Sequence, residues 1–200
     1  MRKIRVLDNV YDLITINMED RFKDNVAFRF YDTANDAVTT ILYKDYVQDI
    51  RKAVNYFQST IPEIKGKKIC LLTKNSYEYA VNTFGVVAAG AVLVLLNQRK
   101  SWDELSYELG LVEPDAILTD GDDYGFNDQL KAAYGDILRP IDGFRNYEPA
   151  QLTRCIDHEA LMVLMFTSGT TGRSKGVMLS EKNFFSVMRA DTQIGEHMMA

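Results

Sequence analysis

The residues best suited to chemistry lie in one short segment, Thr167–Gly176, which reads Thr-Ser-Gly-Thr-Thr-Gly-Arg-Ser-Lys-Gly. It holds three glycines, five hydroxyl side chains and two cations. Glycine lets backbone N–H groups turn inward and approach an anion, and hydroxyls donate hydrogen bonds without adding a competing negative charge. From Ala160 to Ser180 there is no Asp or Glu, although the chain average of 28 in 200 would place about three there. Such a segment favours the binding of an anion, with Lys175 as its cation.

Two other interpretations of this segment have to be weighed. The first is a solvated connection between two strands, because loops rich in Gly, Ser and Thr are common. The second is the Walker loop of P-loop NTPases, which needs glycine directly before its lysine and a helix directly after. Here Ser174 precedes Lys175, and the β-rich run Val177-Met178-Leu179 follows. The sequence therefore disfavours a Walker loop.

The order of the residues is more informative than their types. Thr-Ser-Gly-Thr-Thr-Gly-x-x-Lys-Gly resembles the phosphate-binding signature of the adenylate-forming enzymes, which include acyl-CoA synthetases and adenylation domains. Eight specified positions at roughly 7% usage each give on the order of 10⁻⁹ per starting position by chance, so the match is specific. Weaker similarity to the same family extends through Leu42–Tyr46 and Val86–Asn97, where Leu95 stands at the usual proline position.

The resemblance implies a two-step reaction. ATP and a carboxylate give an acyl-adenylate and pyrophosphate, and a thiol such as coenzyme A then takes the acyl group. Mg²⁺ is expected to share in stabilising the phosphate charge. The family's loop holds the β- and γ-phosphates, and the matching positions here are Thr167, Ser168, Gly169, Thr170, Thr171, Gly172 and Lys175.

The variable position Arg173 is expected to point to solvent. Two departures from the family's pattern stand near the loop. Ser174 takes the place of a common proline, which removes a stiffening residue. Glu181 takes the place of a common histidine, and neither change removes an expected phosphate contact.

The amino-acid sequence of the loop and of the residues after it is most similar to that of bacterial long-chain fatty-acid–CoA ligases. A fatty acid is therefore the expected substrate. An amino-acid or aryl-acid adenylation enzyme stays open. A non-catalytic nucleotide-binding module, or another nucleotide-dependent enzyme such as a kinase, is the alternative from a different class.

The family is much longer than 200 residues, and its adenine, ribose and acyl sites and its C-terminal catalytic lysine lie after the loop. Residues 1–200 are therefore expected to be the N-terminal part of an AMP-binding (adenylation) domain, truncated after the phosphate loop and inactive alone. No catalytic residue is assigned within them, and the metal ligands stay unassigned.

The elements expected around the loop are those of an α/β fold. Short apolar strands alternate with helical patterns, which is the signature of parallel βαβ units with helices on both faces of the sheet. An N-terminal β-hairpin is predicted at 26–31 and 38–42, and a weak helix before it at 8–22. Further strands are predicted at 67–72, 92–96, 116–119 and 160–166, and helices at 43–57, 75–89, 102–109 and 126–134.

Several boundaries rest on single residues. Asn75 and Glu78, like Ser101 and Glu104, have the spacing of a capping box at the start of a helix. Gly90 and Gly110 stand where helices are expected to stop. Residues 138–157 show little periodicity and are predicted to be a long irregular connection.

Composition sets the broad class of the protein. The chain is 46% hydrophobic and 26% charged, with a net charge of −5, which fits a globular protein and disfavours nucleic acid as a partner. The longest apolar stretch is too short to span a bilayer. Two cysteines, Cys70 and Cys155, give no disulfide framework, so a cytoplasmic location is expected.

Overall fold

The computed structural model describes residues 7–32, 36–154, 157–167 and 173–187, and its centre is a six-stranded sheet in the order β6-β5-β3-β4-β7-β8. Five of these strands are parallel, and β8 runs antiparallel to β7 at one edge. The strands are β3(Lys68–Leu72), β4(Val92–Leu95), β5(Ala116–Thr119), β6(Leu138–Pro140), β7(Leu161–Thr167) and β8(Lys175–Ser180). The predicted α/β class is thereby confirmed.

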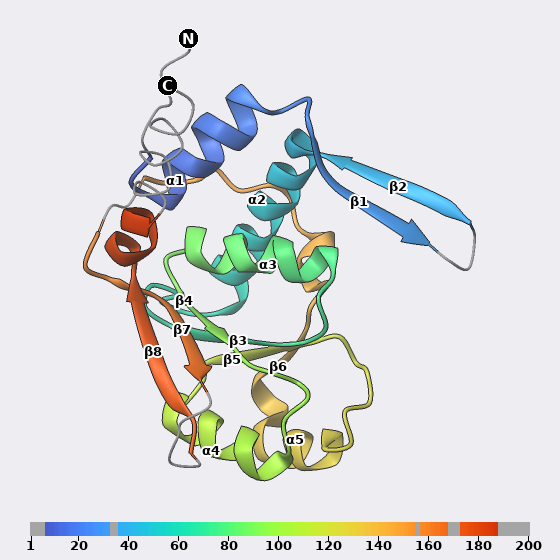
Figure 1. Cartoon of the computed structure of the whole chain (residues 1–200), viewed down its shortest axis with the longest axis vertical. Helices are drawn as coiled ribbons and strands as arrows, with labels where there is room; N and C mark the ends of the chain where they lie inside the picture. The colour runs from blue at the N-terminus through green and yellow to red at the C-terminus, as the bar shows by residue number, and fades with distance from the viewer. Residues whose placement is uncertain (1–6, 33–35, 155–156, 168–172, 188–200) are drawn as a thin grey trace, which may run out of the picture.

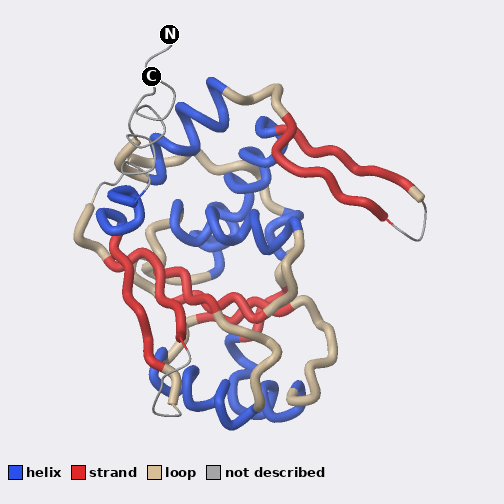
Figure 2. The backbone as a smooth tube through the Cα atoms, in the orientation of Figure 1, coloured by secondary structure: helices blue, strands red, loops and turns tan. Residues whose placement is uncertain are grey.

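Helices cover both faces of the sheet, as Figures 1 and 2 show. On one face lie α2(Tyr43–Thr60) and α3(Tyr77–Ala88), and on the other lie α4(Trp102–Val112) and α5(Asn127–Tyr134). Strand residues alternate between the two resulting cores. Ile69 and Leu71 belong to the first, and Cys70 and Leu72 belong to the second. The central strands β3, β4 and β5 are buried on both sides, so they are apolar along most of their length.

The N-terminal region packs against the first of these cores. The short helix α1(Val10–Asp12) continues into η1(Leu13–Arg21), a π-type helical segment in which hydrogen bonds span five residues. At its end, the Phe22 N–H donates to the Asn17 carbonyl at 2.8 Å. The predicted hairpin is present as β1(Val26–Asp32) and β2(Ala37–Leu42), which project from the side of the molecule (Figure 1).

Two predicted helix boundaries are wrong. The N-cap of α3 is Ser76, whose hydroxyl accepts from the Tyr79 N–H at 3.1 Å, and not Asn75. Helix α4 begins with the predicted Ser101–Glu104 capping box but continues through Gly110. It ends at Val112, and the residue after it, Glu113, adopts the left-handed conformation at φ 50°. Gly90 does end its helix as predicted, with φ 85°.

The predicted irregular connection at 138–157 is wrong in its first part. After η2(Gly135–Ile137), residues Leu138–Pro140 form β6, which adds a parallel edge strand to β5. The single turn η3(Gly143–Asn146) follows and packs against α2. After β8 the chain enters a helix over residues 181–187. Among the helices of the described residues, none combines the length and apolarity needed to cross a bilayer.

Candidate functional site

The predicted loop connects β7 to β8 at one edge of the sheet. Strand β7 is parallel to β4, so the loop leaves the carboxyl end of a parallel strand, where open α/β sheets bind their ligands. Thr167 is the last residue of β7 and pairs with Lys175, the first residue of β8. The Thr167 hydroxyl lies 3.5 Å from the Lys175 carbonyl oxygen, and both side chains are exposed.

The structure therefore brings together the two ends of the predicted phosphate loop. The other predicted site residues, Ser168, Gly169, Thr170, Thr171 and Gly172, lie outside the described residues. Their contacts with a ligand stay a prediction from the sequence.

Helix α4 lies beside the loop and contacts its second half (Figure 1). Arg173 is exposed, as predicted, but its guanidinium also sits over the ring of Tyr107, 5.2 Å from the centroid. A cation over an aromatic face gains about 0.5–1 kcal/mol at exposed sites. Arg173 is thus directed onto α4. Lys175 is exposed, and none of the described carboxylates forms an ion pair with it.

A buried ion pair below the loop was not predicted from the sequence. Lys100 pairs with Glu108, whose carboxylate is fully buried, and the Lys100 ammonium also donates to the Ser174 hydroxyl at 3.2 Å. The same ammonium lies 6.0 Å from the ring centroid of Phe166 in β7. One signal was available, because Glu108 falls among the buried positions Leu105, Leu109 and Val112 of α4, where a charge is unusual.

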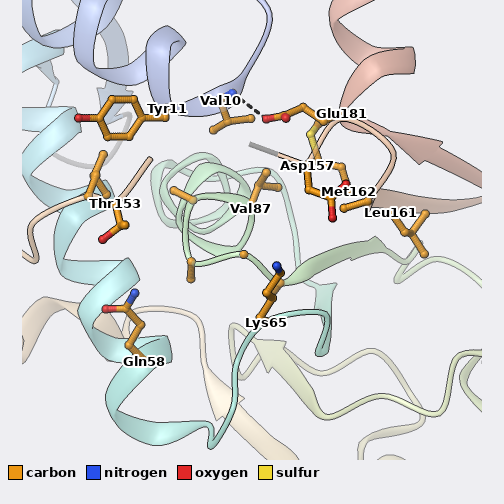
Figure 3. Close-up of a pocket in the computed structure, with 16 residues that line it drawn as sticks. Val10, Tyr11, Gln58, Lys65, Val87, Thr153, Asp157, Leu161, Met162 and Glu181 are labelled. Carbon is orange, nitrogen blue, oxygen red and sulfur yellow. Dashed lines mark hydrogen bonds between the residues drawn. The ribbon is translucent and has the colours of Figure 1, made fainter. Parts of the chain in front are cut away.

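A separate cavity of about 180 Å³ lies at the amino ends of β4 and β7, at the opposite end of β7 from the loop (Figure 3). It is lined by residues 87–91, which lead into β4, and by residues 160–162 at the start of β7, so it faces the amino ends of these strands. Glu181 lines it too, and accepts a hydrogen bond from the Val10 N–H. Burial raises the pKa of this carboxyl, and neighbouring His158 partly offsets the rise. Neither Thr167 nor Lys175, the two predicted site residues that the structure describes, lines this cavity.

The remaining candidates from the sequence are the two cysteines and the acidic and histidine side chains. Cys70 is fully buried in β3, and Cys155 lies outside the described residues. The part of the chain that is described contains no group of three or more His, Cys, Asp or Glu side chains placed to hold a metal ion. Among the described residues, the candidate site is therefore the base of the β7–β8 loop, where Thr167 and Lys175 pair.

Comparison with known proteins finds curated relatives that match part of the chain. The 2-succinylbenzoate–CoA ligase of Bacillus cereus is 31% identical over 122 residues, which cover 61% of this chain and 24% of the relative. The 4-coumarate–CoA ligase-like 2 protein of Arabidopsis thaliana is 26% identical over 150 residues. This match covers 63% of this chain and 26% of the relative. The chain thus spans about a quarter of the length of these curated relatives.

Solved structures share the fold. ATP-bound MatB from Rhodopseudomonas palustris superposes with a TM-score of 0.73 at 24% identity, over 90% of this chain and 36% of that chain. The N-terminal subdomain of Klebsiella oxytoca NpsA, in complex with 3-hydroxybenzoyl-AMSN, superposes with a TM-score of 0.71 at 19% identity. The match covers 88% of this chain and 42% of that chain. The family model described as AMP-binding enzyme matches residues 18–198. The chain therefore belongs to the AMP-binding enzyme family, within the adenylate-forming superfamily that its Thr167–Gly176 segment resembles.

Proposed function

We propose that the complete protein activates a carboxylic acid with ATP, forming an acyl-adenylate and pyrophosphate, and then transfers the acyl group to coenzyme A. Membership of the AMP-binding family and relatives named as CoA ligases support this acid–thiol ligase activity. The single observation that carries the proposal is the family's phosphate-loop order between β7 and β8.

In this proposal the loop holds the β- and γ-phosphates of ATP. Thr167 and Lys175 stand opposite each other at its base, and the hydroxyls and glycines of residues 168–172 supply further donors. Charge-assisted hydrogen bonds from an ammonium to phosphate oxygens are about twice as strong as neutral ones. The described residues offer no carboxylate set for Mg²⁺, so the ion is treated as part of the MgATP substrate.

Residues 1–200 are proposed to form the N-terminal part of the adenylation domain. They hold the phosphate loop but cover only a quarter of the relatives' length, so groups outside them must complete the adenine, ribose and acyl sites. We accordingly expect residues 1–200 alone to be inactive. A cytoplasmic location is proposed with this activity, since the chain carries the free cysteine Cys70.

The acid itself has two candidates. The residue order of Gly172–Ser180, which is similar to that of bacterial long-chain fatty-acid–CoA ligases, supports a fatty acid as the substrate. The curated relatives named for 2-succinylbenzoate and 4-coumarate support an aryl acid as the second candidate.

The test is carboxylate-dependent exchange of pyrophosphate into ATP by the complete protein, with fatty, aryl and amino acids compared. The proposal predicts exchange with one class, release of AMP, and thioester formation when coenzyme A is added. Release of ADP would point to a kinase, and binding of ATP without exchange by any acid would point to a non-catalytic module. Either result contradicts the proposed activity.

A further inference from the structure

Three side chains, those of Lys100, Glu108 and Ser174, lie in contact at the carboxyl-terminal end of the loop. Lys100 precedes α4, Glu108 lies within α4, and Ser174 is the last residue before β8. Lys100 pairs with the Glu108 carboxylate and donates to the Ser174 hydroxyl at 3.2 Å. An ammonium group has three donors and no acceptor, so one lysine can serve both partners at once.

The burial of this pair argues that it has a role besides stability. The Glu108 side chain is 0% exposed and that of Lys100 is 17% exposed. Desolvating two such charges offsets most of their attraction, and apolar residues of similar volume are often equally stable in their place. One Glu108 oxygen, Oε2, also has no hydrogen-bond partner in the described part of the chain. An apolar pair would avoid both penalties, but it could not donate to Ser174.

We propose that Lys100 is a positioning residue for the phosphate loop. Glu108 holds the Lys100 ammonium in place, and the hydrogen bond from this ammonium to the Ser174 hydroxyl, called the tether below, restrains the loop. Ser174 directly precedes Lys175, whose backbone is fixed on its other side by pairing with Thr167. The tether and the strand pairing together restrict where the Lys175 ammonium is presented. This inference rests on the proposed function, because it assigns the tether a purpose through the nucleotide site.

The alternative is that the ion pair only stabilises the fold, and three variants of the complete protein separate the two. Ser174→Ala removes the acceptor and leaves the ion pair intact. Ser174→Thr keeps a hydroxyl. The double variant Lys100→Met with Glu108→Leu replaces both charges by apolar side chains, which avoids the unpaired buried carboxylate that Lys100→Met alone would leave.

The readout is the KM for ATP in the exchange reaction, with urea unfolding as the check on stability. Positioning predicts that Ser174→Ala and the double variant each raise the KM about fivefold, the size of one lost hydrogen bond, in proteins that urea unfolding shows to be folded under the assay conditions. Ser174→Thr keeps the wild-type KM. A matched control is Lys67→Met, which removes the half-buried Lys67–Asp115 pair at the amino ends of β3 and β5 and leaves the KM unchanged. A wild-type KM in both Ser174→Ala and the double variant overturns the proposal.

A second readout keeps the test independent of the proposed function. If the wild-type protein catalyses no exchange with any acid, the proposed function fails, and the tether is then judged by trypsin. Trypsin cleaves after Arg173 and Lys175, both of which are exposed. In that case the tether predicts faster cleavage of Ser174→Ala than of Ser174→Thr at equal stability. Equal cleavage rates overturn it.

Discussion

The backbone N–H of Val10 donates a 3.0 Å hydrogen bond to the Glu181 carboxylate, which joins residues 171 positions apart in the sequence (Figure 3). The bond connects α1 to the helix that follows β8. Since β8 begins at Lys175, the strand that carries the loop lysine is anchored at its far end to the N-terminal region. The N-terminal segment is thus part of the support for the site.

Glu181→Gln tests this anchor. Desolvation by burial raises the pKa of the Glu181 carboxyl, Asp8 and Asp157 raise it further, and the Val10 N–H and His158 act to lower it. A carboxyl whose pKa is higher in the folded state stabilises the fold below its unfolded pKa and loses that contribution as the pH rises through the folded pKa. Glutamine does not ionise, and its amide oxygen still accepts from Val10. The variant is therefore expected to gain stability relative to wild type between about pH 4 and pH 7.

The measurement is urea unfolding of both proteins at these two pH values. The matched control is Glu159→Gln, because in the part of the chain that the structure describes Glu159 pairs at the surface with Lys182, and its loss should shift stability by less than about 0.5 kcal/mol. A difference between Glu181→Gln and wild type that does not change with pH would contradict the expected titration.

Two glycines within helices should respond oppositely to alanine. A Cβ on Gly85 of α3 would lie 2.6 Å from the Ala53 Cβ of α2, so Gly85→Ala should destabilise the protein by about 1–3 kcal/mol. A Cβ on Gly110 of α4 would meet nothing within 4 Å, so Gly110→Ala should stabilise it by about 0.5–1 kcal/mol. Denaturant unfolding of the two variants measures both effects. A stabilising Gly85→Ala would show that α2 and α3 do not approach this closely, and a destabilising Gly110→Ala would contradict the open space at Gly110.

The Cys70 thiol should be unreactive in the native protein. It is fully buried in β3, and burial raises its pKa, so the nucleophilic thiolate is scarce. Alkylation with iodoacetamide at pH 8, followed at Cys70 by mass spectrometry, should be slow until urea unfolds the chain. Fast native modification at Cys70 would contradict the packing of this side of the sheet.

The alternation of strands and helices was predictable because buried parallel strands are apolar along their whole length. The boundary at Gly110 was not, because a glycine signals a helix end only where the backbone needs a positive φ. Here the apolar spacing continues to Val112, which is buried, and Glu113 makes the turn instead. Strand β6 has only three residues, and its pairing with β5 is a tertiary contact that local periodicity does not record.

The candidate site was predictable as a segment but not as a set of contacts. The order of residues in Thr167–Gly176 identified the loop, and parallel strand pairing explains why it stands at the carboxyl edge of the sheet. The Lys100–Ser174 contact joins positions 74 apart, and no local spacing links them. A charge on the buried face of α4, at Glu108, was the one sign of it in the sequence.

The central claim is that the β7–β8 loop binds the phosphates of ATP through Lys175. The most direct measurement compares Lys175→Met with wild type in the complete protein, by ATP binding and by carboxylate-dependent pyrophosphate exchange. Lys182→Met is the control, because within the described residues the Lys182 side chain forms an exposed pair with Glu159. We predict that Lys175→Met weakens ATP binding by roughly 10- to 100-fold, as expected for a lost hydrogen bond to a charged group, and that Lys182→Met does not. ATP affinity and exchange within twofold of wild type in Lys175→Met would contradict the account.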